Sequence, residues 1–326
     1  MYILAVDDDP IILETLKYFV GSMPDHEIVT AESALDALEL MADQSRLFDC
    51  FLLDIQMPGT DGIELCSILR SVGGYERTPI LMLTAMSDKG YIDNAFKAGA
   101  TDYITKPFEL NSLRGRLNLV EPIADDIRVR AEKIASADTG EAKFEAGQSF
   151  VELHEPFPIM DVDGVIENHA IENYVNQLSR KSLCGSVCLA FTIRHVADLY
   201  HDISNYDFSC MITDVSEAIS DCLSPAHRLV SYAGNGTFVS VIEGASHIDT
   251  DRLVDQINLH IHRMELAQSN GERLKVRVCA GGMKRMVWRK GNAAVDALRE
   301  AHDSSEQNAD RLERELGNIW TTAQIA

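Results

Sequence analysis

The sequence of 326 residues has no apolar run that approaches the length of a membrane-spanning helix, which is about 20 residues. It also has nothing like a secretory leader at its start, because the apolar run Tyr2–Val6 begins without a charged segment before it. These two absences argue against membrane insertion and secretion. We therefore expect a cytoplasmic protein with no membrane-inserted part.

Positive charge is scarce, with 29 lysine and arginine residues against 51 aspartate and glutamate residues and a formal net charge of −22. Neutralisation of phosphates supplies most of the non-specific affinity of proteins for DNA. The sequence also has no helix-turn-helix pattern followed by a basic recognition helix. DNA is therefore not an expected partner.

Cysteine spacing does not follow the rhythm of a metal site, since the seven cysteines are scattered and odd in number. Such a pattern predicts reduced thiols. Cys184 and Cys188 are predicted to pack in the core at the two ends of a strand. The run His260-Ile261-His262 is predicted to lie on the exposed side of a helix, so no structural metal is expected.

What the sequence does contain is a set of apolar runs that end in polar residues. Tyr2–Val6 is followed by three aspartates at positions 7 to 9, Cys50–Leu53 by Asp54, and Pro79–Leu83 by Thr84. Continuous apolar runs separated by helical patterns are typical of buried parallel strands. In open α/β sheets ligands bind beyond the carboxyl ends of such strands, which is where these polar residues would lie.

Gathered carboxylates repel one another and lose water, which a divalent cation can offset. Magnesium suits this pocket because it takes oxygen ligands and keeps several waters. Lys106 would supply a positive charge for phosphoryl oxygens, and the Thr84 hydroxyl a directed donor. An acidic triplet alone is typical of a solvated turn, but these features in this order predict in-line phosphoryl transfer onto Asp54.

Residues 1 to about 120 resemble a response regulator receiver domain. The matching residues are Asp7, Asp8, Asp54, the turn from Met57 to Gly62, Thr84, Tyr103 and Lys106-Pro107. The resemblance implies a flavodoxin-like, doubly wound α/β fold with a five-stranded parallel sheet. The sequence pattern itself alternates in the same way, with strands predicted near 2–6, 27–30, 50–53, 79–83 and 101–104, and helices near Ile11–Gly21, Ala34–Asp43, Gly62–Ser71, Lys89–Ala98 and Leu110–Leu119.

The same resemblance implies roles for individual residues. Asp8 and Asp54 would bind Mg²⁺ directly, Asp7 through water, and Gln56 through its backbone carbonyl. Lys106 would pair with the phosphoryl group, and the Lys106-Pro107 peptide would be cis. Thr84 and Tyr103 would form a switch pair. The phosphoryl donor would be a histidine kinase or a phosphotransfer protein.

An amphipathic helical pattern follows Pro122, with apolar residues at 123, 127, 131 and 134. It predicts either a plain surface helix or a short dimer seam, and both remain open.

The second half of the chain centres on a predicted hairpin. Residues Leu229–Ile242 form a strand, turn and strand pattern around Gly234-Asn235-Gly236. Further strands are predicted at Gly185–Arg194 and Leu274–Gly282, and helices at Phe208–Leu223, His247–Leu266 and Asn292–His302. Residues 158–305 resemble the diguanylate cyclase, or GGDEF, family, with Gly234–Phe238 where that family has Gly-Gly-Asp-Glu-Phe. This implies an α/β sandwich with a mostly antiparallel sheet.

The departures from that family concern its chemistry. Gly236 and Thr237 replace the Asp and Glu of the motif, and Thr192 replaces a metal-binding Asp on the first strand. Arg194 adds a positive charge there, and the family's feedback site corresponds to Pro225 and Arg228. Cyclase activity is therefore predicted to be absent. The turn glycines could bind phosphate through backbone amides, or could be present because the hairpin needs positive φ. Arg194 and Arg228 could face a partner's carboxylate or be solvated.

The resulting domain map has a receiver at 1–120, a helical linker at 121–157, a degenerate GGDEF-like output domain at 158–305 and a helical tail at 306–326. The expected function is non-enzymatic. Phosphorylation of Asp54 would control homodimerisation, or binding of a downstream protein, by the output domain. One alternative is a phosphorylation-gated effector that binds GTP or cyclic di-GMP, and another is an active diguanylate cyclase.

Overall fold

The computed structural model describes residues 1–43, 46–85, 89–137, 151–160, 162–224, 226–244, 248–286 and 293–323. The chain divides into two compact units, Met1–Glu145 and Ala146–Ala326, and each is described by itself. None of the helices in the described part is long and apolar enough to cross a membrane.

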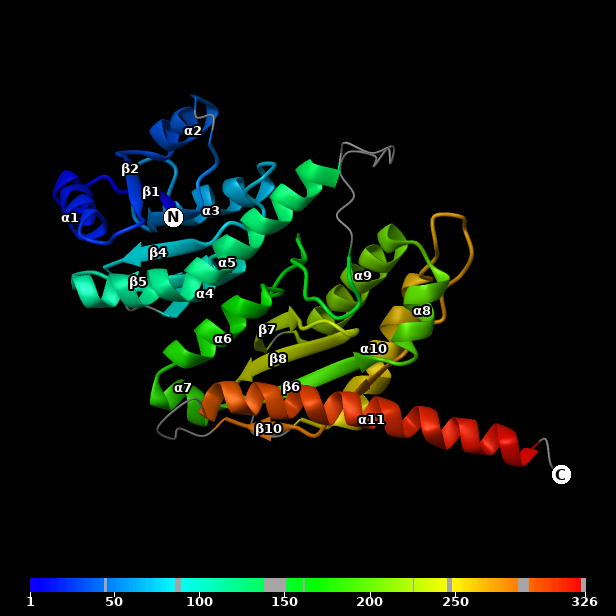
Figure 1. The fold of residues 1–326 in the computed structure, drawn as a ribbon. Coiled ribbons are helices and arrows are strands. Elements are labelled where there is room, and N and C mark those ends of the chain that lie inside the picture. Colours follow the sequence, from blue (N-terminus) through cyan, green and yellow to red (C-terminus); the bar gives the residue numbers. More distant parts are fainter. Residues whose placement is uncertain are drawn as a thin grey trace. The chain divides into compact units, whose positions relative to one another are not determined.

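The first unit is a parallel sheet wrapped by helices (Figure 1). Its strands are β1 (Tyr2–Val6), β2 (Glu27–Ala31), β3 (Cys50–Asp54), β4 (Ile80–Thr84) and β5 (Asp102–Thr105). Its helices are α1 (Pro10–Gly21), α2 (Ala34–Asp43), α3 (Gly62–Ser71), α4 (Lys89–Lys97) and α5 (Leu110–Ala137). The strand order is β2-β1-β3-β4-β5, and every neighbouring pair is parallel. The predicted doubly wound, five-stranded parallel sheet is confirmed.

Both faces of this sheet are apolar. Successive residues of a strand point to opposite faces, so neighbouring apolar residues enter different cores. In β1, Leu4 packs in a core with residues of α2, α3 and α4. Its neighbour Ile3 packs in the other core, with residues of α1 and α5. Both side chains are fully buried. This explains why each strand appears in the sequence as a continuous apolar run.

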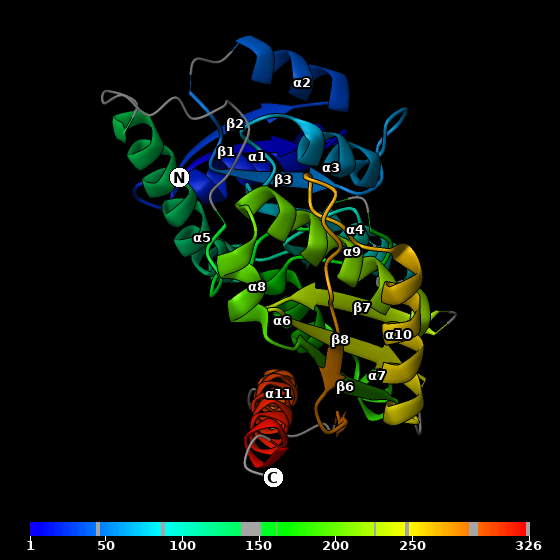
Figure 2. The same cartoon turned by 90° about the vertical axis from the view of Figure 1, so that its right-hand side faces the viewer.

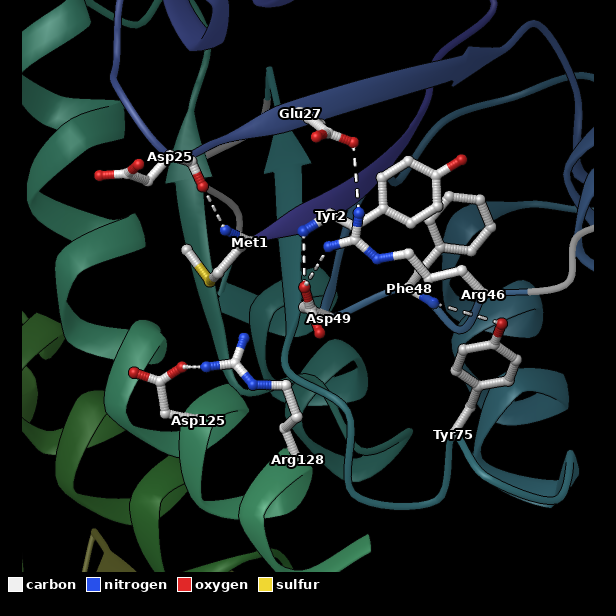
Figure 3. A network of polar contacts seen from close by, with 10 residues as sticks. All are labelled: Met1, Tyr2, Asp25, Glu27, Arg46, Phe48, Asp49, Tyr75, Asp125 and Arg128. Atoms are coloured by element: carbon white, nitrogen blue, oxygen red, sulfur yellow. Dashed lines mark hydrogen bonds and ion pairs between the residues drawn. The ribbon is translucent and has the colours of Figure 1, made fainter. Parts of the chain in front are cut away.

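A polar network closes the end of the sheet where β1 begins (Figure 3). The backbone N–H of Tyr2 donates to Asp49 Oδ2 over 2.6 Å, and the Tyr2 ring stacks on Phe48 with centroids 4.6 Å apart. The Arg46 guanidinium lies 4.6 Å above the Tyr2 ring and pairs with Glu27 at 3.3 Å. This cluster fixes the entry of β1 at the end opposite to the predicted site.

Helix α5 corrects one prediction, because it continues from Leu110 to Ala137 through Pro122. The sequence had predicted separate helices over 110–119 and 123–134, since an interior proline removes a hydrogen bond and clashes with the preceding turn. Val120 and Ala124, on either side of Pro122, are both buried. We infer that the continuous buried stripe outweighs the proline penalty.

The second unit is built on an antiparallel sheet. Its strands are β6 (Ser186–Ile193), β7 (His227–Tyr232), β8 (Thr237–Glu243), β9 (Val278–Ala280) and β10 (Lys284–Arg285). Its helices are α6 (Asn168–Gln177), α7 (Arg180–Cys184), α8 (Val196–Asp202), α9 (Asn205–Leu223), α10 (Thr250–Met264) and α11 (Ala293–Ala323). The order is β10-β6-β8-β7, with β9 also paired to β6. The predicted C-terminal antiparallel sheet, with its β7–β8 hairpin, is confirmed.

Helices cover both faces of this second sheet (Figure 2). Val187 and Phe191 of β6 point into a core shared with α9 and α10. Thr192, of opposite parity, points to the other face, where its hydroxyl meets Ser305 of α11. Helix α11 runs through residue 305, where the sequence placed a boundary between domain and tail.

The edge of the sheet at β9 is closed by side chains. The Asn258 side chain accepts from the Val278 N–H at 2.8 Å and donates to the Val278 carbonyl at 3.0 Å. Asn308 donates to the Ala280 carbonyl at 2.9 Å, so these three outward groups, which could otherwise pair with another strand, are occupied. The strand predicted at Leu274–Gly282 is confined to Val278–Ala280, because Leu274 pairs with Leu266 in a turn instead.

Two smaller predictions in this unit were wrong. Cys184 ends α7 and is exposed, whereas Cys188 is buried inside β6, so the pair does not flank the strand. His262 is exposed as predicted, but Ile261 is buried against α9 because it lies on the apolar face of α10.

Candidate functional site

The site of the first unit lies at the carboxyl ends of its strands. Asp7 and Asp8 follow β1, Asp54 ends β3, and Lys106 follows β5. Because β1 and β3 are neighbours, with β4 and β5 beyond β3, these residues converge where the carboxyl ends of the strands lie side by side. One carboxylate oxygen from each of Asp7, Asp8 and Asp54 lies within 4.8 Å of the others. The structure therefore brings the predicted acidic cluster together.

Lys106 bridges two of these acids. Its Nζ lies 2.6 Å from Asp7 Oδ2 and 2.7 Å from Asp54 Oδ1. Its backbone N–H donates to the Thr84 carbonyl at 2.7 Å, which ties the end of β5 to the end of β4. The Lys106-Pro107 peptide is cis, as predicted. An ammonium so placed can hold an anionic group that forms on Asp54.

The electrostatic balance of the site follows from burial. Burial raises the pKa of Asp54 above its usual value, although the Lys106 ammonium acts in the opposite direction. Burial alone would lower the pKa of Lys106, but hydrogen bonds to Asp54 and Asp7 raise it. Three carboxylates thus lie near the Lys106 ammonium, which pairs with two of them, and the excess of negative charge favours a cation.

The donor set fits a magnesium ion. All the candidate ligand atoms are oxygens, which Mg²⁺ prefers, and it usually keeps several waters. Asp7 and Asp54 are buried, whereas Asp8 is exposed, so the cluster has a solvent-facing side from which water can coordinate. Gln56, two residues after Asp54, is also exposed.

A close backbone approach shapes the loop after Asp54. The Gly62 N–H donates to the Ile55 carbonyl at 3.0 Å, and a Cβ on Gly62 would lie 1.9 Å from the Asp54 carbonyl oxygen. Only glycine fits at this distance. Asp61 accepts from the Glu64 N–H at 2.8 Å and so starts α3 at this point.

Thr84 and Tyr103 lie on adjacent strands. Met82 pairs in register with Tyr103, and Thr84 lies two residues further along β4 on the same face. Thr84 is buried, and the half-buried Tyr103 ring packs edge-on to Phe96 of α4 with centroids 6.3 Å apart. Burial, followed by the nearby Asp102, raises the pKa of Tyr103. The two residues therefore stand where a change at the site could reach α4.

Comparison with known families agrees with this geometry. The protein-family model for the response regulator receiver domain matches residues 3–118 of this chain. Residues 3–118 form a receiver domain.

Curated relatives match the same receiver domain. The chain is 39% identical over 117 residues to the response regulator MprA of Mycobacterium leprae (strain TN), covering 36% of this chain and 49% of MprA. It is 37% identical over 114 residues to the two-component response regulator ARR10 of Arabidopsis thaliana, covering 35% and 20% respectively. The chain thus spans about half or less of the length of these relatives.

Solved structures also resemble the receiver domain. A putative response regulator from Chloroflexus aurantiacus J-10-fl is 35% identical, with 38% of this chain and 97% of that chain covered and a TM-score of 0.35. The receiver domain of the sensor histidine kinase PA1611 from Pseudomonas aeruginosa PAO1 is 28% identical, with 36% and 93% covered and a TM-score of 0.33. The latter is described with a magnesium ion coordinated in its active site cleft.

The second unit has its own buried polar cluster, separate from the receiver site. Thr192 and Thr237 are register partners on β6 and β8, and their hydroxyls are 2.9 Å apart. The Thr192 hydroxyl also donates to Ser305 Oγ of α11 over 2.8 Å. All three side chains are buried. Thr192 and Thr237, the two threonines singled out from the sequence, do meet, but as neutral hydroxyls. Ser305 was not expected from the sequence.

The two arginines singled out in this unit lie inside it. Arg228 donates to Ser220 Oγ at 3.1 Å and pairs with Asp163 at 3.3 Å, with its side chain only 12% exposed. Both predictions for Arg228, that it faces a partner's carboxylate and that it is solvated, are therefore wrong. Arg194 is half-buried, and its Nε is buried without a hydrogen-bond partner among the described residues. Pro225 lies outside the described residues.

Proposed function

We propose that the protein is a two-component response regulator in which Asp54 accepts a phosphoryl group from a histidine kinase or a phosphotransfer protein. The observation that carries this proposal is the Asp54 carboxylate, buried at the end of β3 and 2.7 Å from Lys106 Nζ. Asp7 and Asp8 stand beside it as further oxygen donors. The same receiver assignment supports histidine kinases as the donor class.

Each residue has a part in the transfer. An Asp54 oxygen attacks the phosphorus of a phosphohistidine, the P–N bond breaks, and its electron pair leaves with the imidazole. Asp8, Asp54 and the Gln56 carbonyl would hold Mg²⁺, with Asp7 acting through water, and the ion would neutralise charge on the phosphoryl oxygens. Lys106 moves from Asp54 to the new phosphoryl group. The Thr84 hydroxyl donates to it, and Tyr103 follows Thr84.

This function is tested by phosphorylation with a small phosphodonor such as acetyl phosphate, read by intact-protein mass spectrometry. Wild type should gain one phosphoryl group in magnesium and none in EDTA. Asp54→Asn should gain none, whereas Asp43→Asn, a change on the exposed end of α2, should behave as wild type. Full phosphorylation of Asp54→Asn would reject Asp54 as the acceptor.

We further propose that residues 158–305 form a degenerate GGDEF-like output domain, joined to the receiver (1–120) by the linker 121–157 and followed by the tail 306–326. It acts by binding a downstream protein or a second copy of the chain, and not by cyclase chemistry. The neutral cluster of Thr192, Thr237 and Ser305 supports this proposal, because two-metal catalysis needs carboxylates at such positions.

Restoring a carboxylate tests this reading of the cluster. Wild type should make no cyclic di-GMP from GTP and magnesium in a chromatographic assay. Thr237→Glu should also make none, and should lose roughly 3 kcal/mol or more of unfolding free energy, because the side chain is fully buried under α11. Turnover by either protein would overturn the proposal. Thermal stabilisation by GTP or cyclic di-GMP would favour a nucleotide-binding effector.

A further inference from the structure

The glycines of the turn between β7 and β8 are explained by backbone conformation rather than by phosphate binding. Gly234, Asn235 and Gly236 all have positive φ. The Asn235 N–H donates to the Leu153 carbonyl at 2.7 Å, and the Gly236 N–H donates to the Tyr232 hydroxyl at 3.3 Å. A phosphate has no free amide at these two positions. An anion site in this unit has to be sought among its cationic side chains.

Two arginines stand directly opposite each other where β6 ends. The register of β6 and β9 pairs Ile193 with Val278, and the next backbone N–H, that of Arg194, donates to the Arg277 carbonyl at 2.9 Å. Arg194 and Arg277 are therefore cross-strand partners, with Cα atoms about 5.5 Å apart and side chains on the same face of the sheet. Like charges in such positions destabilise a sheet. An anion bound between them would remove this repulsion.

A third cation, Lys275, lies on the same face. Burial alternates along this segment, because Val276 and Val278 lie in the core formed with α9 and α10, whereas Lys275 and Arg277 are exposed. Residues two apart in an extended chain point to the same side, so Lys275 accompanies Arg277 and Arg194. We name Arg194, Lys275 and Arg277 the cationic cluster.

The described part of the chain does not neutralise the cationic cluster. None of its three members forms an ion pair with a described residue, and the buried Arg194 Nε has no hydrogen-bond partner among them. Composition does not explain the cluster. Acidic residues outnumber basic ones by 51 to 29 in the whole chain, yet none occurs between positions 273 and 286.

One acidic residue, Glu313 of α11, lies near the cluster. Burial raises the pKa of Cys279 to about 11, while the Arg194 guanidinium lowers it and Glu313 raises it, so both charges lie near that thiol. The Glu313 carboxylate is engaged with His195, because its Oε1 accepts the His195 N–H at 2.6 Å and lies 3.7 Å from His195 Nδ1. Even with Glu313 counted, the cationic cluster keeps an excess of positive charge.

We propose that Arg194, Lys275 and Arg277 form a binding site for the phosphate group of a small molecule. A phosphate monoester carries a charge of about −1.5 to −2 at pH 7 and has three acceptor oxygens, so it can accept from both guanidinium groups and the ammonium at once. It balances the excess that Glu313 leaves, whereas a single carboxylate does not. The site needs no metal ion. It is also independent of the phosphorylation of Asp54, so neither proposal depends on the other.

Isothermal titration calorimetry of the full chain with inorganic pyrophosphate tests the site, in EDTA so that the receiver holds no magnesium. Wild type should bind, and Arg277→Glu should bind about tenfold more weakly or not at all, because a negative charge replaces a charged donor. Arg252→Glu, which makes the same change at an exposed arginine of α10, should bind as wild type does. Equal affinities of wild type and Arg277→Glu, or no binding by wild type, would overturn the proposal.

Urea unfolding provides a second test that uses the like-charge pair itself. Without phosphate, Arg277→Gln should have a midpoint equal to or above that of wild type, because it removes repulsion between the strands. With pyrophosphate, the midpoint of wild type should rise above that of the variant, because a ligand stabilises the fold that binds it. A variant that is less stable by the same amount in both solutions would show that Arg277 serves only the fold, and the proposal would be wrong.

Titrations with other anions distinguish the source of the phosphate group. Binding of GTP that is tighter than that of pyrophosphate, and is lost in Arg277→Glu, would identify a nucleotide. Equal affinities for the two would identify recognition of the phosphate alone. A short polyglutamate peptide should bind more weakly than pyrophosphate. If it bound more tightly, the partner would be a protein carboxylate and the phosphate assignment would be overturned.

Discussion

Lys106 is the residue whose loss should be felt most in the receiver, because its ammonium is shared by Asp7 and Asp54. Lys106→Met should lower the unfolding free energy in EDTA by roughly 3 kcal/mol, since it leaves buried carboxylates without a counter-charge. Magnesium should recover part of that loss by taking the place of the ammonium. Urea unfolding of both proteins, with and without magnesium, measures the difference.

The control for this prediction is Lys17→Met, which breaks a pair with Glu14 on the exposed side of α1. Exposed pairs contribute about 0–1 kcal/mol, so little change is expected. Equal losses in the two variants, or a loss in Lys106→Met that magnesium does not reduce, would contradict the account of the site.

Asp207 should make the second unit sensitive to acid. Hydrogen bonds from the Ser204 hydroxyl and from the Ser269 N–H lower the pKa of its carboxyl below the usual value. A lowered pKa in the folded state means that the carboxylate stabilises the fold above the unfolded pKa of about 3.9, and that this stability is lost as pH falls through the folded pKa. Asp207→Asn should therefore be less stable than wild type at pH 7 and equal to it in acid.

Urea midpoints measured between pH 7 and acid test this dependence, with the exposed Asp255→Asn as control. A deficit in Asp207→Asn that stays constant with pH would show that the carboxylate charge is not the cause. The sequence could not reveal this contact, because Asp207 lies in the first turn of α9 and Ser269 lies 62 residues further along the chain, in a turn after α10.

At the same scale, the receiver acids could be predicted because each follows an apolar strand directly. Arg70 could not. Its guanidinium is buried and donates to the carbonyls of Gly99, Tyr75 and Thr78. Backbone carbonyls leave no trace in the side-chain pattern, so a buried arginine bound only to them looks like any exposed helical arginine.

At the scale of elements, Arg70 joins the end of α3 to the turn after α4. Gly99 in that turn has φ +98°, and a Cβ there would lie 2.8 Å from Arg70 Nε. Gly99→Ala should therefore cost roughly 2 kcal/mol of unfolding free energy through strain and displacement of Arg70. Thermal or urea unfolding measures this loss.

Gly73→Ala is the matched control, because a Cβ at Gly73 would meet nothing within 4 Å. It should change stability by about 0.5 kcal/mol or less. If Gly99→Ala were as stable as this control, the turn would be free to move away from Arg70, and α3 and α4 would not be coupled through it.

Helix and strand bounds were predictable where local pattern and tertiary burial agree. Helix α3 begins and ends at Gly62 and Ser71, as predicted, because the Asp61 cap and the apolar face both mark it. Helix α5 was predicted in two pieces, because Pro122 is a local signal for a break. The side chains on either side of the proline are buried together, and that tertiary fact is not local in the sequence.

At the scale of the whole molecule, the proposed output depends on whether phosphorylation changes assembly. Light scattering of wild type with beryllofluoride and magnesium should show a rise in mass towards a dimer, and Asp54→Ala should show none.

The half-buried Ile127 belongs to the apolar stripe that continues along α5, whereas Val129 is exposed on a different side of the same helix. If this stripe is the dimer seam, Ile127→Glu should abolish the rise and Val129→Glu should leave it intact. If both variants still dimerise, α5 is a plain surface helix there and the contact lies elsewhere. Retention of the dimer by Val129→Glu alone would assign the seam to the Ile127 side, because the two variants add the same charge to the same turn of one helix.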